Sequence, residues 1–342
     1  MRHYWVVIVL AVAAVAAGVA FYTGALRLPS NLAGLGFNGG VCEVDGEIGS
    51  STRAAVDAAT DKFAQAMLGG KPETALALMT DAGRAKSLNF AAQLKAYTHN
   101  ADFTNIHIVH TIYIDNHGTG ADTKTLCPGD GHFLSLFLRP GAQQAHIEVA
   151  ADTVSNGWLL EAWLLQEHGG WRVQYVHIGP SSVAGHDTRD LLTMAKKERD
   201  GGHDFNAAML YTGAVFVADT GPSWVNADLQ KELKGVRDSL KTPPELSGPV
   251  PFTWTLAGKD YKVSHVTIQG IKKDLGLIID LPQADWPSDA IGNQRGRDFL
   301  TAYTAAHPDY ARDFSYLVAR TLKPDNSGGY ATVYQRGKGL LN

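Results

Sequence analysis

Apolar residues recur along the first part of the chain at a spacing that predicts helices, and then at a spacing that predicts strands. Apolar residues at helical spacing predict an amphipathic helix over residues 52–68. Two shorter helices are expected after it, over residues 72–79 and about 83–99. The apolar period then changes to two, which is typical of strands that bury one face. These strands are expected at residues 103–115, 131–139, 143–152, 157–167 and 170–178.

The pattern in the second half of the chain predicts a helical segment and a further domain. Apolar residues at helical spacing predict a helical connector over residues 185–242. Prolines at Pro243, Pro244 and Pro249 mark a linker after it. Residues 250–342 then combine strand patterns with one helical pattern, which predicts a small α+β domain. We therefore expect the whole chain to be α+β.

The first 25 residues are apolar after a short basic start. Trp5 to Tyr22 carry no charged side chain, and an apolar run of about 18 residues is just long enough to cross a bilayer as a helix. The same composition fits a cleaved secretory signal, with small residues near Gly24 at the cut. Residues 1–25 are thus expected to be a membrane anchor or a signal peptide. In both cases we expect the rest of the chain to lie outside the cytoplasm. With the anchor, it would be an inner-membrane protein that faces the periplasm or the extracellular side.

Residues 26–50 are rich in Gly, Asn, Leu and Ser, which is typical of a flexible tether. The tether includes Cys42, one of two cysteines in the chain; the other is Cys127. An even pair of cysteines outside the cytoplasm is a candidate disulfide. The alternative is two unrelated thiols. A disulfide would close a loop of about 85 residues and stabilise the fold by roughly 4 kcal/mol in the chain-entropy model.

Composition describes an ordinary globular chain of 342 residues. Hydrophobic residues make up 45% and charged residues 19% of the chain, so disorder is not expected. The formal net charge is -4, and no long basic run occurs. Nucleic acid is therefore not expected as a partner, because such binding needs a clustered positive field.

Three helices followed by antiparallel strands is the element order of the NTF2-like (SnoaL-like) cone, and residues 51–180 resemble it. The run Glu167-His168-Gly169-Gly170-Trp171-Arg172-Val173 resembles the final hairpin of many such domains. The resemblance implies a curved sheet that wraps the long helix and leaves a cavity. Family members include ketosteroid isomerases and dehydratases. Others are non-catalytic domains that follow a membrane anchor in secretion-system assembly factors and in some penicillin-binding proteins.

The connector has a weaker resemblance. Gly201-Gly202 followed by Phe205, Ala208 and Tyr211 is similar to a single tetratricopeptide-type hairpin. One hairpin cannot form a solenoid, since such repeats need about three copies to bury a core. The C-terminal segment, residues 250–342, resembles no family that we recognise.

Common catalytic motifs are absent from the sequence. The chain has no Gly-x-Ser-x-Gly elbow, no Ser-x-x-Lys pair, no His-Glu-x-x-His helix and no nucleotide-binding glycine loop. His107 and His110 differ by three on a predicted strand, so their side chains should face opposite ways and suit one metal poorly. No cofactor and no metal are expected.

The first folded unit carries the one group of residues with candidate chemistry. His146 and Glu148 should share a face of one strand, and His177 lies on the last strand; these three are the candidate catalytic residues. Aromatic residues that would line a ligand cavity are Tyr113, which should share its face with His107, and Trp171 and Tyr175, which should share theirs with His177. Alternation puts one face of each strand inward, and the sequence does not say which.

These patterns favour a non-catalytic, membrane-tethered envelope protein that binds a small apolar ligand or a protein partner. The basis is the apolar N-terminal run, the cysteine pair and the lack of a recognised catalytic spacing. One alternative is an isomerase- or dehydratase-type enzyme that uses the cone cavity. Another is a structural subunit of a secretion or envelope assembly.

Overall fold

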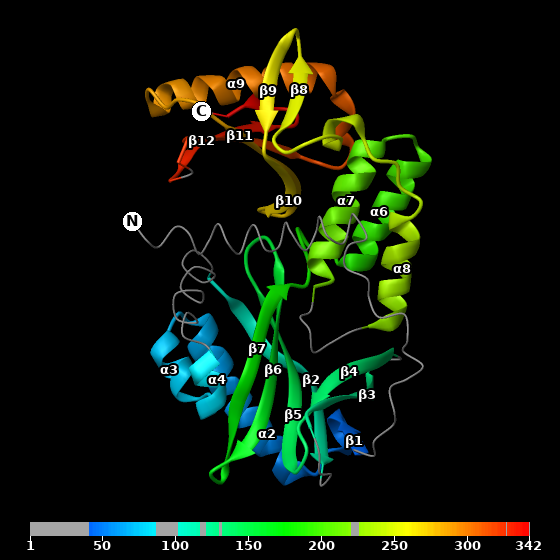
Figure 1. Cartoon of the computed structure of the whole chain (residues 1–342), viewed down its shortest axis with the longest axis vertical. Coiled ribbons are helices and arrows are strands. Elements are labelled where there is room, and N and C mark those ends of the chain that lie inside the picture. The colour runs from blue at the N-terminus through cyan, green and yellow to red at the C-terminus, as the bar shows by residue number, and fades with distance from the viewer. Residues whose placement is uncertain are drawn as a thin grey trace. The chain divides into compact units, whose positions relative to one another are not determined.

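A computed structural model shows an α+β chain that divides into two compact units (Figure 1). Unit 1 comprises Met1–Ser181 and Asp219–Glu232, and unit 2 comprises Ser182–Ala218 and Leu233–Asn342. The structure describes residues 41–86, 102–116, 121–129, 132–219, 226–325 and 327–341. The expected anchor or signal at residues 1–25 and most of the expected third helix lie outside these residues. Among the described helices, none has the length and apolar character needed to cross a membrane.

Unit 1 begins with helices, as the sequence predicts. The long helix α2 spans Ser50–Leu68 and buries the side chains of Val56, Phe63 and Met67 on one face. It ends at Gly69, where a Cβ would lie only 2.6 Å from the carbonyl oxygen of Gln65. Two short helices follow, α3 (Pro72–Ala77) and α4 (Asp81–Lys86).

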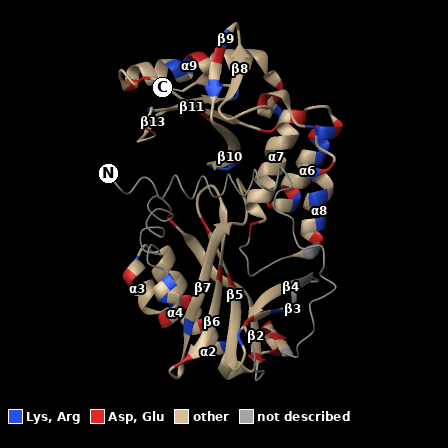
Figure 2. Cartoon of the chain, in the orientation of Figure 1, with Lys and Arg blue, Asp and Glu red and all other residues tan. Residues whose placement is uncertain are grey.

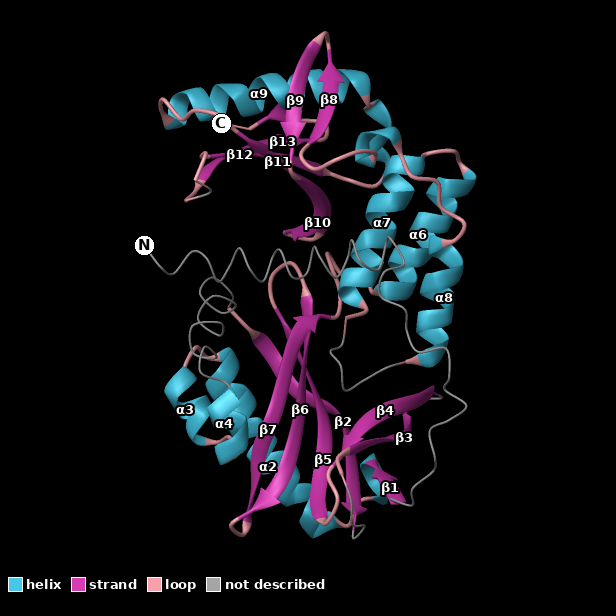
Figure 3. Cartoon of the chain, in the orientation of Figure 1, coloured by secondary structure: helices cyan, strands magenta, loops and turns pink. Residues whose placement is uncertain are grey.

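The main sheet of unit 1 has five antiparallel strands in the order β1-β2-β5-β6-β7. The helix α2 packs on one face of this sheet (Figure 3). Apolar residues from α2, β5, β6 and β7 form a continuous core between helix and sheet. The strands are β1 (Val41–Val44), β2 (Thr104–Asn116), β5 (Ala142–Asp152), β6 (Gly157–Glu167) and β7 (Gly170–Pro180).

A second layer covers part of the opposite face of this sheet. It is the hairpin of β3 (Thr123–Gly129) and β4 (His132–Leu138). Leu136 and Leu138 of this hairpin pack with Ile112 and Ile114 of β2 in a small separate core. The sequence pattern did not indicate β3.

Residues 41–47 differ from the flexible tether expected over residues 26–50. Val41–Val44 form the edge strand β1, which pairs with β2, and a single turn of 3-10 helix follows over Asp45–Glu47. The Gly- and Asn-rich composition did not reveal this strand, because its order comes from backbone pairing and a covalent bond to another strand.

Unit 2 contains the helices α6 (Thr188–Asp200) and α7 (Asp204–Val217), together with the end of α8 (Ala227–Arg237). Its second sheet runs in the order β10-β11-β12-β13-β14 and carries α9 (Asp289–Ala306) against β12 and β13. The strands of this sheet are His265–Ile271, Asp274–Pro282, Tyr316–Leu322, Gly329–Gln335 and Gly339–Leu340. A separate hairpin joins β8 (Phe252–Leu256) to β9 (Lys259–Val263).

Two features of unit 2 were not expected from the sequence. The strands β11 and β12 are parallel, and α9 connects them. The helices α6 and α7 of the expected connector belong to the same compact unit as the C-terminal strands. Gly213 of α7 lies close to Ile268 of β10, so the connector packs on the C-terminal sheet directly.

Candidate functional site

The candidate residues of unit 1 are distributed over both faces of the five-stranded sheet. On β5, Ala145, Ile147 and Val149 belong to the core beneath α2. His146 and Glu148 alternate with them and therefore point to the opposite face. The predicted shared face of His146 and Glu148 is thus present, and it is the face away from α2. Few charged residues lie on β5, β6 and β7 (Figure 2).

His146 is fully buried between the sheet and the β3–β4 hairpin. Its ring stacks on the indole of Trp163, with centroids 5.7 Å apart and planes 7° from parallel. Its Nε2 lies 2.9 Å from the backbone oxygen of Phe137 on β4, so Nε2 carries the proton and donates it to this carbonyl. Its Nδ1 has no hydrogen-bond partner in the described residues. The histidine therefore attaches the second layer to the main sheet.

Burial lowers the pKa of His146 to about 4, although the hydrogen bond to the Phe137 carbonyl acts in the opposite direction. The ring is consequently neutral at physiological pH. A general base must reach the proton that it removes from a substrate. A side chain with no exposed surface, in a hydrogen bond to the backbone, is poorly placed for that role.

A bulge in β7 separates the aromatic candidates. The register passes from Trp163 opposite Tyr175 to Leu164 opposite Val173, which leaves one extra residue on β7. Trp171 packs against the core beneath α2, where its ring meets that of Tyr113 edge-on at 6.2 Å. Tyr175 lies beside Trp163 on the opposite face. The prediction that Trp171 and Tyr175 share one face of the strand is therefore wrong.

Bulges in β2 have the same effect on Tyr113. The register shifts twice between Thr104 and His110. His107 consequently aligns with Ala150, whereas Tyr113 aligns with Ala145, and these two β5 residues point to opposite faces. The prediction that His107 and Tyr113 share one face of the strand is wrong for this reason. Alternation in the sequence cannot show an inserted residue.

A row of ionisable residues crosses the sheet on the face away from α2. Glu148 of β5 is directly opposite Glu161 of β6, and Glu161 is directly opposite His177 of β7. Glu161 is 2% exposed. The Nε2 atom of His177 lies 3.3 Å from the backbone oxygen of Asp219. Burial, followed by the charges of Glu161 and Asp219, raises the pKa of the Tyr175 hydroxyl beside this row.

Glu161 was not among the candidates from the sequence, although a signal for it exists. It is the single charged residue in an apolar run from Trp158 to Leu165. A lone charge within a strand buried on both faces is costly unless it is paired or hydrogen-bonded. Its position joins Glu148 and His177, which the sequence had placed on separate strands.

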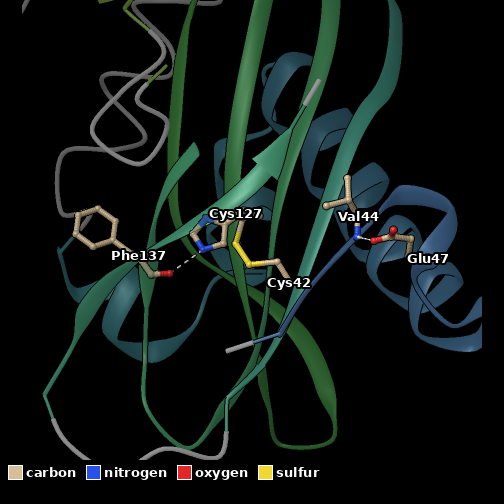
Figure 4. Close-up of a disulfide and its surroundings, with 6 residues drawn as sticks. Cys42, Val44, Glu47, Cys127 and Phe137 are labelled. Carbon is tan, nitrogen blue, oxygen red and sulfur yellow. Dashed lines mark hydrogen bonds between the residues drawn. A yellow bond between two sulfur atoms is a disulfide. The ribbon is translucent and has the colours of Figure 1, made fainter. Parts of the chain in front are cut away.

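The predicted disulfide is present. Cys42 of β1 and Cys127 of β3 are bonded, with their Cα atoms 5.8 Å apart (Figure 4). The bond connects the edge strand of the main sheet to the second layer. Cys127 is completely buried among Ile112, Ile114 and Leu136.

The histidines of β2 have separate local partners. The Nδ1 atom of His107 lies 2.6 Å from the backbone oxygen of Asn105, and that of His110 lies 3.0 Å from the Asp45 carboxylate. Within the described parts of the chain, no three His, Cys, Asp or Glu side chains are grouped so that they could hold a metal ion.

Comparisons with protein-family models, curated proteins and solved structures give no match to this chain. The functional argument therefore depends on the sequence and on the geometry of the described residues.

Proposed function

We propose that the chain is a non-catalytic, membrane-tethered envelope protein whose folded part binds a partner outside the cytoplasm. The Cys42–Cys127 disulfide is the observation that carries this proposal. Disulfides persist in oxidising compartments and are rare in the reducing cytosol. The uncharged run from Trp5 to Tyr22, whether an anchor or a signal, is consistent with export of the remainder.

Unit 1 supports an NTF2-like cone as its fold. Helices precede the strands β2, β5, β6 and β7, these strands are antiparallel neighbours, and the long helix α2 packs on one face of their sheet. The hairpin between β6 and β7 turns at His168 and Gly169, both of which have positive φ. This is the hairpin on which the sequence resemblance depends.

The state of His146 supports binding over catalysis. Of the three candidate catalytic residues, it is the one that is fully buried, neutral and engaged by the backbone of a neighbouring strand. Tyr113 and Trp171 pack on one another against the core, which favours a protein partner over an apolar ligand held between helix and sheet.

One observation favours the enzyme alternative. Glu148, Glu161 and His177 lie in register on three adjacent strands, and two carboxylates beside an imidazole are suited to proton transfer. An NMR pH titration of these three side chains tests it. A pair poised for proton transfer would titrate near neutral pH. The two glutamates decide the test, because an ordinary histidine titrates between about pH 5 and pH 9 whatever its role. If neither glutamate titrates in that range, the enzyme alternative fails.

The main proposal is tested in bacterial cells that produce the full-length chain. A thiol-reactive polyethylene glycol should modify no cysteine until reductant is added, and protease added to spheroplasts should degrade the chain. A variant that lacks residues 1–25 is the control, and both of its thiols should react at once. Free thiols in the full-length chain, together with protection from protease, would contradict the proposed location.

Partner binding is tested in the same cells by photo-crosslinking. Benzoylphenylalanine is placed at Val109, an exposed position on β2, and at Glu73 on α3 as the matched control. We expect an adduct of discrete mass from β2 that the control lacks. Equal labelling at both positions, or none, would contradict a partner at this strand.

A further inference from the structure

A pocket of about 220 Å³ lies within unit 2, and none of the candidate catalytic or ligand-binding residues of unit 1 lines it. It is formed by the turn between α6 and α7, by the short 3-10 helix Pro244–Leu246, and by the C-terminal end of α9 with the 3-10 helix Pro308–Arg312 that follows. The residues that carry the argument are His203, Asp204, Glu245, Tyr303, His307 and Asp309.

The charge of the pocket is negative. Asp204, Glu245 and Asp309 line it, and no lysine or arginine is among the described residues that do so. The nearby Arg312 is directed to the buried carboxylate of Glu198, with Nε 3.5 Å from an oxygen of Glu198. The Nδ1 atom of His203 lies 3.1 Å from the same oxygen. No lysine or arginine of the pocket wall therefore neutralises the three lining carboxylates. The imidazole of His307 lies beside one of them, with Nδ1 3.8 Å from an oxygen of Glu245.

Tyr303 supplies the second, independent observation. This residue is 1% exposed, and it lines the pocket. Its hydroxyl forms no hydrogen bond with any group that the structure describes. Burial, and then the charges of Glu245 and Asp309, hold the pKa of this hydroxyl well above its usual value, so it stays protonated and its oxygen can accept a hydrogen bond. The hydroxyl oxygen is therefore available to a hydrogen-bond donor that enters the pocket.

The wall that carries Tyr303 is a cluster of packed rings. The ring of Tyr303 lies 5.6 Å from that of Trp254, 5.7 Å from that of Phe299 and 4.8 Å from the imidazole of His307. Trp254 is itself fixed by a 2.7 Å hydrogen bond from its Nε1 to the backbone oxygen of Glu245. Aromatic faces beside carboxylates attract organic cations through both charge and the ring quadrupole.

We propose that this pocket binds a small organic cation, a primary amine attached to a compact apolar body. The ammonium group would lie among Asp204, Glu245 and Asp309 and donate a hydrogen bond to the hydroxyl oxygen of Tyr303. The apolar body would lie against the rings of Tyr303 and Phe205. The lining carboxylates would repel an anion of the same shape, and a neutral analogue would leave them without a cation. This site is separate from unit 1 and does not depend on the function proposed above.

The test is calorimetric titration of the full-length chain in detergent with three probes of one shape: benzylamine, benzyl alcohol and benzoate. We expect benzylamine to bind at one site. Benzyl alcohol should bind at least about tenfold more weakly, because a charge-assisted hydrogen bond contributes roughly 1.5–3 kcal/mol. Benzoate should give no binding. Absence of benzylamine binding, or benzoate binding of equal strength, would overturn the proposal.

Two variants locate the site, each with a matched control. Glu245→Gln should weaken benzylamine binding about tenfold, whereas Glu73→Gln, an exposed position of unit 1, should not change it. Tyr303→Phe removes only the hydroxyl and should also weaken binding. Its control is Tyr261→Phe, because Tyr261 contacts Phe299 in the same aromatic cluster but does not line the pocket. Unchanged affinity in both Glu245→Gln and Tyr303→Phe would place the binding elsewhere and overturn the site.

Discussion

The imidazole of His146 lies flat against the indole of Trp163, 5.7 Å between ring centroids, while its Nε2 donates a hydrogen bond to the Phe137 carbonyl. Two strands of the main sheet and one strand of the second layer thus meet at a single histidine. Protonation of this ring would place a charge where there is no solvent. Its acid–base state is therefore coupled to the stability of unit 1.

The first prediction concerns that coupling. The pKa of His146 is lowered from an ordinary value near 6.5 to about 4 in the folded chain. Between pH 6.5 and about pH 4 the unfolded state consequently binds more protons than the folded state does. The free energy of unfolding therefore falls as the pH drops through this window. The shift corresponds to a loss of about 3 kcal/mol. Hydrogen exchange of β5 peptides at several pH values measures it.

A variant without the titrating ring separates this effect from that of other histidines. In His146→Phe, β5 should show a smaller loss of protection between about pH 6.5 and pH 4. His107→Gln changes an exposed histidine and should retain the full pH dependence. If His146→Phe responds to pH as the native chain does, His146 is not the coupled group.

The second prediction concerns the disulfide. The bond joins residues separated by 85 positions. In the chain-entropy model, removing a cross-link that closes so long a loop destabilises a fold by about 4 kcal/mol. The double variant Cys42→Ala, Cys127→Ala should therefore lower the urea midpoint for loss of β2 and β3 protection. Protection in unit 2 should not change, and a decrease there would show that the two units do not unfold separately.

The third prediction concerns an ion pair in unit 2. Arg320 donates two hydrogen bonds to the carboxylate of Asp280, at 2.6 and 2.7 Å, and Asp280 is 7% exposed. Burial alone would raise the pKa of Asp280, but hydrogen bonds from His265 and Arg320 and their charges outweigh it and hold the pKa below its usual value. The Asp280 carboxylate therefore stabilises the fold at pH values above the ordinary carboxyl pKa. This stabilisation is lost as the pH falls through the lowered pKa of the folded chain.

A double-mutant cycle measures the pair. Arg320→Ala should destabilise unit 2 by about 2 kcal/mol or more, because it leaves a buried carboxylate without its main partner. Asp280→Asn in the Arg320→Ala background should cost less than it does alone. Additive losses in urea unfolding would mean that the two side chains are not coupled.

The fourth prediction concerns the close approach of α7 to β10. A Cβ on Gly213 would lie 2.7 Å from Cγ1 of Ile268 and would also clash with its Cδ1. Gly213→Ala should therefore destabilise unit 2 by about 1–3 kcal/mol, although alanine is the better helix former. Adding Ile268→Val removes the clashing Cδ1 and should recover part of this loss.

The matched control is Gly235 in α8, where a Cβ would meet nothing within 4 Å. Gly235→Ala should raise the thermal midpoint, by an amount that corresponds to about 0.5–1 kcal/mol of helix propensity. If both alanine variants stabilise the chain, then α7 does not pack on β10 as closely as the structure indicates.

Local patterns in the sequence determined many individual elements. The helical spacing over residues 52–68 matches α2, and the alternation over residues 143–152 matches β5, because burial of one face imposes a fixed period on a regular element. The cysteine pair indicated the disulfide, because the chain has no third cysteine to compete.

Only the tertiary structure decided which face each candidate residue occupies. The bulges in β2 and β7 each insert a residue, and every side chain beyond an inserted residue changes face. Tyr113 and Trp171 therefore lie beneath α2, while Tyr175 lies on the other face. Such an insertion leaves no mark in the apolar period of so short a strand.

The burial of His146 and the pocket around Tyr303 also required the folded chain. His146 is covered by a hairpin whose first strand the sequence did not indicate, and the pocket joins Asp204 to His307 across about a hundred residues. Sequence periodicity records how one element packs on its neighbours. It does not record which distant elements meet, because those contacts are fixed by long-range packing and backbone pairing.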